Sequence, residues 1–230
     1  MNLLPCPVAV TARQFPNCVA VRSPHENLTY AKLELCVEEF CRKLRRRGIQ
    51  PGDRVGLLGP KQTGYVVAFW SLLRYGATAC PLNTRWPVSA LADAKDVATI
   101  HHVLTQEDWS SASRLNRGAS VTRTDDIPEM GTHEATIVFS SGSSGQPKAI
   151  VHNASAHIAN ARGANVNIPL TAGDAWLLSL PLFHISGMAI LVRCALAAAT
   201  VVVPNEGLAL NQQIECDRPT HLSLVPTQLK

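Results

Sequence analysis

A run of small hydroxyl and glycine residues between two apolar segments constrains this chain more than any other feature. The apolar segment 136–139, Thr-Ile-Val-Phe, leads into the run, and a second apolar segment, 149–151, follows it. The β-branched and aromatic residues of these segments predict buried strands. The sequence therefore predicts two strands joined by a loop that reads Ser140-Ser141-Gly142-Ser143-Ser144-Gly145-Gln146-Pro147-Lys148.

The residue types of this loop are those of a phosphate-binding site. Its glycines permit close approaches that a Cβ would block, and successive backbone N–H groups can converge on an anion. The serines add hydroxyl donors, and the lysine adds a charge that reaches phosphate oxygens. No Gly-Lys-Ser/Thr follows the first glycine, so the loop is not a Walker A motif. A flexible linker is the alternative, although linkers seldom lie between two strands and end in Pro-Lys. The predicted phosphate ligands are Ser140, Ser141, Gly142, Ser143, Ser144, Gly145 and Lys148.

Composition places the chain among globular proteins with a substantial core. Of its 230 residues, 46% are hydrophobic and 17% are charged, which suits an α/β domain. The net charge of +4 is too small to argue for nucleic acid. The seven cysteines are scattered without a Cys-x-x-Cys pair, so we expect neither zinc nor disulfides and infer a reducing compartment. His101 and His102 are adjacent, point to opposite faces of a strand and predict no metal site.

The first half of the chain alternates strands and helices. Helical spacing of apolar residues after Thr29, a good N-cap, predicts a helix over residues 30–47. A strand at 54–58, an apolar helix at 63–75 and a strand at 77–82 predict a right-handed βαβ unit with a parallel sheet. Residues 105–133 are polar and predict a loop-rich connector. The basic run Arg42–Arg47 is either a polyanion-binding patch or, as we prefer, a solvated helix end.

A second informative stretch is Pro181-Leu182-Phe183-His184-Ile185-Ser186-Gly187. It predicts a turn from a strand into an apolar helix over residues 187–198, with Ser186 as the N-cap. This geometry would bring His184, Ser186 and free N–H groups to one helix start, where a carboxylate or phosphate is favoured. A packed turn without a ligand is the alternative. Upstream, Asn153 predicts an N-cap, and we expect His152 and His157 to be surface or capping histidines.

The loop at residues 140–148 resembles the phosphate loop of the adenylate-forming superfamily, which includes acyl-CoA synthetases, luciferases and peptide-synthetase adenylation domains. Two positions depart from the usual pattern: Ser144 replaces a threonine, and Ala149 replaces a glycine. The segments 176–187 and 220–229 resemble the acyl-CoA synthetases of menaquinone and phylloquinone biosynthesis in particular. The resemblance extends from about residue 27 to the last residue.

The resemblance implies an α/β fold of mixed, mostly parallel sheets flanked by helices, with residues 1–230 as the N-terminal part of an AMP-binding domain and the C-terminal domain absent. It implies a cytoplasmic ligase that joins a carboxylic acid to AMP, using ATP and Mg²⁺, and then to coenzyme A. Residues 140–148 would hold the ATP phosphates. His184 would act as the catalytic side chain beside the acyl pocket, with Ser186 and Gly187 near the substrate.

Arg193 predicts a further property of the substrate. A lone arginine in an apolar helix is costly unless it is paired or reaches water, and the second carboxylate of a dicarboxylic acid would supply a partner. An exposed arginine at the surface is the alternative.

The superfamily's later motifs, including its magnesium-linked glutamate, have no counterpart in the sequence. We therefore expect that residues 1–230 do not make acyl-CoA unaided and that they leave a sheet edge or an apolar face exposed. A non-catalytic module that binds nucleotide or pyrophosphate is the alternative function.

Overall fold

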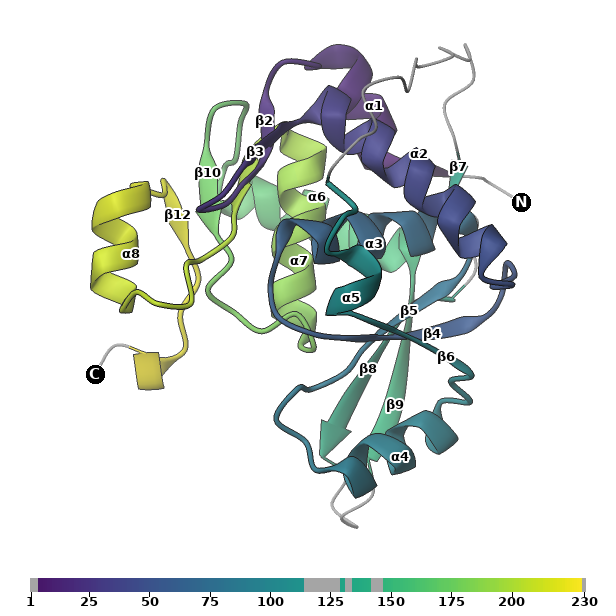
Figure 1. The fold of residues 1–230 in the computed structure, drawn as a ribbon. Helices are drawn as coiled ribbons and strands as arrows, with labels where there is room; N and C mark the ends of the chain where they lie inside the picture. The colour runs from purple at the N-terminus through teal and green to yellow at the C-terminus, as the bar shows by residue number, and fades with distance from the viewer. Residues whose placement is uncertain (1–3, 114–128, 131–133, 142–146, 229–230) are drawn as a thin grey trace.

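A computed structural model describes residues 4–113, 129–130, 134–141 and 147–228 (Figure 1). The described residues form two five-stranded sheets and a short ribbon of β1 and β7. The first sheet has the order β6–β4–β5–β8–β9, and the second has the order β12–β10–β11–β2–β3. The strands are β1 (Leu4–Pro5), β2 (Val19–Arg22), β3 (Asn27–Thr29), β4 (Arg54–Leu58), β5 (Thr78–Pro81), β6 (His102–Thr105), β7 (Glu129–Met130), β8 (Glu134–Ser141), β9 (Pro147–Asn153), β10 (Ala175–Leu177), β11 (Thr200–Val202) and β12 (His221–Leu222).

Both sheets are parallel except at one edge. In the first sheet β6, β4, β5 and β8 run parallel, and β9 returns antiparallel to β8. In the second sheet only the pairing of β2 with β3 is antiparallel. The carboxyl ends of the parallel strands therefore meet along one edge of each sheet, where α/β proteins place their binding sites. The predicted mixed, mostly parallel α/β fold is confirmed.

Helices cover both faces of each sheet. Figure 1 shows α3 and α7 between the two sheets, and the largest apolar cluster combines residues of α1, α2, α3, α6 and α7. A second cluster buries one side of α4 against β5 and β8, and a third packs α8 on β10 and β11. The helices are α1 (Pro7–Gln14), α2 (Tyr30–Arg46), α3 (Thr63–Tyr75), α4 (Val88–Val97), α5 (Gln106–Trp109), α6 (Ala154–Asn167), α7 (Ile185–Ala197) and α8 (Leu210–Asp217), with a 3₁₀ turn at Pro226–Gln228.

The strand–helix–strand prediction for the first half is confirmed. The β4–α3–β5 unit has parallel strands, and the Thr29 hydroxyl caps α2 by accepting the N–H of Lys32. The basic end of α2 is largely paired within the chain: Arg42 and Arg46 contact Glu39, and Arg47 contacts Asp108. These contacts favour a solvated helix end over a polyanion-binding patch.

Several details differ from the sequence-based expectations. His157 is buried, with 6% of its surface exposed, and its Nε2 lies 2.8 Å from the Thr136 hydroxyl, because α6 packs on β8. The expected connector begins with a helix, α5, whose first turn is closed by a capping box between Thr105 and Asp108. Helices α1 and α8 have no counterpart in the prediction. No helix among the described residues combines the length and apolar character of a membrane span.

Candidate functional site

A cavity of about 320 Å³ lies where β5 and β8 end and the chain turns into α7. Because β5 and β8 are parallel neighbours, the segments that follow them meet at the same edge of the sheet. The loop between β10 and α7 closes the cavity from the other sheet. The lining residues are Pro81, Asn83, Trp86, Ala90, Asp93, Phe139, Ser140, Pro147, Phe183 and His184.

The predicted phosphate loop begins at this cavity. Ser140 is half-buried near the end of β8 and lines the cavity, and the ladder register places it opposite Lys148 of β9. Lys148 is exposed, so its ammonium is available to an anion. Ser141 is the last residue of β8. The predicted ligands Gly142, Ser143, Ser144 and Gly145 lie outside the described residues.

The start of α7 differs from the prediction by two residues. The N-cap is His184, not Ser186, and the helix begins at Ile185. The N–H groups of Gly187 and Met188 donate to the His184 carbonyl, which closes the first turn earlier than the hydroxyl pattern suggested. His184 and Ser186 are exposed, and only His184 lines the cavity. Of the predicted pair, His184 thus lines the cavity and Ser186 does not, and the binding of a carboxylate or phosphate at this helix start stays a prediction.

Gly187 makes this arrangement possible. A Cβ at this position would lie 2.1 Å from the Pro181 carbonyl oxygen. Only a residue without a side chain lets the first turn of α7 pack directly on the backbone of the Pro181–Leu182 turn. That packing holds His184 at the rim of the cavity.

Aromatic side chains form an apolar wall that the sequence analysis did not select. Trp86 and Phe139 contact edge-to-face with ring centroids 5.8 Å apart, and the Arg85 guanidinium lies 5.8 Å from the Phe183 ring centroid. Trp86 and Asn83 follow β5 directly. Their position after the carboxyl end of a parallel strand was the available signal, since such positions line the binding edge of α/β sheets.

Arg193 is placed away from the cavity lining and is buried, with 7% of its surface exposed. Its Nε donates to Asn165 Oδ1 at 2.8 Å, one Nη donates to the Ile168 carbonyl at 3.0 Å, and the guanidinium stacks 4.1 Å from the Trp176 ring centroid. The alternative of an exposed surface arginine is wrong. The chain itself supplies partners, so burial alone no longer requires a substrate carboxylate. Within the described part of the chain, the other terminal nitrogen, Nη1, has no acceptor.

The chain belongs to the AMP-binding enzyme family, whose model matches residues 8–230. It is similar to 2-succinylbenzoate–CoA ligases. The Salmonella typhimurium ligase is 32% identical over 91% of this chain and 46% of the relative, and the Escherichia coli ligase is 32% identical over 92% and 47%. The chain thus spans about half the length of the curated relatives it matches.

Solved structures agree with this assignment of the fold. Bacillus subtilis MenE, an o-succinylbenzoate coenzyme A synthetase in complex with ATP and magnesium ion, superposes with a TM-score of 0.84 at 21% identity, over 99% of this chain and 65% of that one. An arginine-to-lysine variant of Escherichia coli MenE with bound OSB-AMS superposes with a TM-score of 0.81 at 28% identity, over 100% of this chain and 51% of that one. The match to the family model begins at residue 8, earlier than the resemblance of the sequence motifs, which begins at about residue 27.

Proposed function

We propose that this chain supplies the phosphate-binding and acyl-binding half of an ATP-dependent 2-succinylbenzoate–CoA ligase. The observation that carries the proposal is that Ser140, at the start of the phosphate loop, and His184, at the start of α7, line one cavity. The names of the relatives support the acid–thiol ligase class and this acid substrate. The free cysteines suit a reducing cytoplasm.

The residues of the cavity have distinct roles in this proposal. Ser140, with the loop after it and Lys148, neutralises the ATP phosphates, and His184 lies beside the acid. The carboxylate of the acid attacks the α-phosphate, which forms an acyl-adenylate and releases pyrophosphate. The aromatic wall of Trp86, Phe139 and Phe183 excludes water from the reacting groups. Such catalysis rests on positioning and charge neutralisation rather than on a protein nucleophile. Coenzyme A then displaces AMP to give the thioester.

Magnesium fits this scheme as a companion of ATP. The described residues contain no group of three or more His, Cys, Asp or Glu side chains that could hold a metal ion. Magnesium commonly binds through substrate phosphates and only one or two protein carboxylates. We therefore assign it to the phosphates of ATP.

Replacing Lys148 by alanine is expected to weaken ATP binding by about tenfold or more, because a charge-assisted contact with phosphate is lost. Titration calorimetry on this chain measures the effect directly, since the predicted phosphate loop lies wholly within it. Lys95→Ala removes an exposed lysine of α4 outside the cavity lining and is the matched control. Equal ATP affinity in the parent and in Lys148→Ala would show that Lys148 does not contribute to ATP binding.

Arg193 remains our candidate for the second carboxylate of the acid, through Nη1, which has no acceptor among the described residues. Arg193→Gln is then expected to weaken 2-succinylbenzoate binding in the presence of ATP by about tenfold, since a charged hydrogen bond is lost, and to leave benzoate binding unchanged. Arg162→Gln, at an exposed position of α6, controls for net charge. Equal losses for both acids would instead indicate that Arg193 only supports the fold through Asn165 and Trp176.

A further inference from the structure

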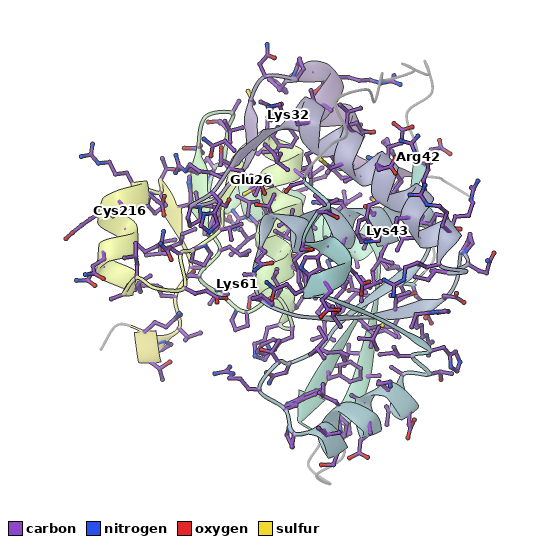
Figure 2. The ribbon with its side chains drawn as sticks, in the orientation of Figure 1. Glu26, Lys32, Arg42, Lys43, Lys61 and Cys216 are labelled. Atoms are coloured by element: carbon purple, nitrogen blue, oxygen red, sulfur yellow. The ribbon has the colours of Figure 1, made fainter. Side chains whose placement is uncertain are left out.

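A second cavity, of about 480 Å³, lies beyond the carboxyl ends of strands from both sheets. The segments that follow β2, β4, β6 and β11 surround it, and none of its described lining residues belongs to the first cavity. Figure 2 shows Lys61, which belongs to the lining, in the region between α5 and α8. The crevice at the carboxyl ends of parallel strands is the usual place for a ligand in an α/β protein.

The wall formed by the start of α3 presents hydrogen-bond donors without partners. The N-cap Gln62 makes no side-chain cap, and the N–H groups of Thr63 and Gly64 have no acceptor among the described residues. Thr63 is 4% exposed and lines the cavity, yet its hydroxyl has no partner in the described part of the chain. The indole Nε1 of Trp109, another lining residue, is buried and also has no acceptor among the residues that the structure describes.

Unpaired buried donors are costly, so such a wall favours a ligand that brings oxygen acceptors. Lys61 adds a positive charge: its ammonium donates to the carbonyls of Leu178 at 2.8 Å and Ser179 at 3.3 Å, which leaves one N–H for a ligand. The positive end of the α3 dipole acts in the same direction. A phosphate group satisfies several of these donors at once.

The rim of the cavity has the opposite character. Glu26 and Glu206 belong to the lining, and neither carboxylate has a hydrogen-bond partner among the described residues. Burial lowers the pKa of Lys61, and the nearby Glu206 carboxylate partly offsets this effect. Two carboxylates beside a phosphate would be unfavourable unless the ligand also carries donors. The rim therefore selects an amino or hydroxyl group at the other end of the ligand.

We propose that this second cavity is a binding site for a small phosphomonoester that carries an amino or hydroxyl group, separate from the ATP-binding cavity. The phosphate lies against the start of α3 and Lys61. The donor-bearing end lies between Glu26 and Glu206. The site does not depend on the function proposed above, because the two cavities share no lining residue among those that the structure describes.

Titration calorimetry on this chain with phosphoethanolamine and with inorganic phosphate tests the proposal. Phosphoethanolamine is expected to bind about tenfold more tightly, because only it contacts the rim carboxylates. Thr63→Val, which replaces the hydroxyl with a methyl group, and Lys61→Met are each expected to weaken phosphoethanolamine binding by about tenfold. Glu26→Gln should reduce the preference of the site for phosphoethanolamine over inorganic phosphate.

Two controls separate this cavity from the phosphate loop and from net charge. Lys148→Ala and Lys95→Met are expected to keep full phosphoethanolamine binding, since both lysines lie outside the second cavity. No phosphoethanolamine binding up to about 10 mM would overturn the proposal. Loss of binding in Lys148→Ala with full binding in Thr63→Val would also overturn it, by assigning the ligand to the phosphate loop. Lys61→Met could unfold the protein, because the Lys61 ammonium donates to the Leu178 carbonyl directly after β10. Thr63→Val does not break this contact, so it tests the site even if Lys61→Met unfolds.

Discussion

Gly187→Ala is expected to destabilise the protein by about 3 kcal/mol, near the upper end for overpacking, because the new methyl group would meet backbone rather than a movable side chain. Its Cβ would lie 2.1 Å from the Pro181 carbonyl oxygen and 2.7 Å from the carbonyl carbon. Relief requires the first turn of α7 to move off the Pro181–Leu182 turn, which also displaces His184. Urea unfolding, followed by circular dichroism, gives the free energy of unfolding of parent and variant.

Gly163→Ala is the matched control. Gly163 lies within α6, and no atom lies within 4 Å of the position its Cβ would take. The same substitution there is expected to stabilise the protein by about 0.5–1 kcal/mol, because alanine loses less conformational freedom in a helix. Similar effects at both glycines would mean that the close approach of α7 to Pro181 is not formed.

The stability of the protein is expected to fall by about 3 kcal/mol between pH 7 and pH 4 on account of His157 alone. Burial, with a smaller contribution from His152, lowers the pKa of His157 from 6.5 to about 4. Between pH 6.5 and pH 4, His157 is therefore protonated in the unfolded chain and neutral in the folded chain. The stabilisation is complete above pH 6.5 and is lost as the pH falls toward 4.

His157→Gln tests this pH dependence, since glutamine is neutral throughout and can still hydrogen-bond to Thr136. The variant should lose about 3 kcal/mol less than the parent between pH 7 and pH 4, measured by urea unfolding at each pH. His101→Gln, at an exposed position, should behave like the parent. Parallel pH profiles for parent and His157→Gln would show that His157 is accessible to protons in the folded state.

Local sequence patterns determined the elements and much of the site's chemistry. The βαβ unit followed from strand and helix periodicity, because each element buries one face or all of its surface. The prediction of a phosphate loop came from residue types that have few other uses between two strands, and it stays a prediction, since residues 142–146 lie outside the described residues. Caps were predictable at Thr29 and Asn153, where a side-chain oxygen accepts a backbone N–H three residues on.

The tertiary structure decided what depends on contacts between distant segments. The N-cap of α7 is His184 because Gly187 packs on the Pro181 backbone. The positions of hydroxyl residues in the sequence do not predict this packing. His157 became buried because α6 packs on β8, and Arg193 found Asn165 and Trp176, which lie 28 and 17 residues before it in the sequence. The two cavities exist because the carboxyl ends of parallel strands meet in space. Which strands become neighbours depends on contacts between segments that are far apart in the sequence.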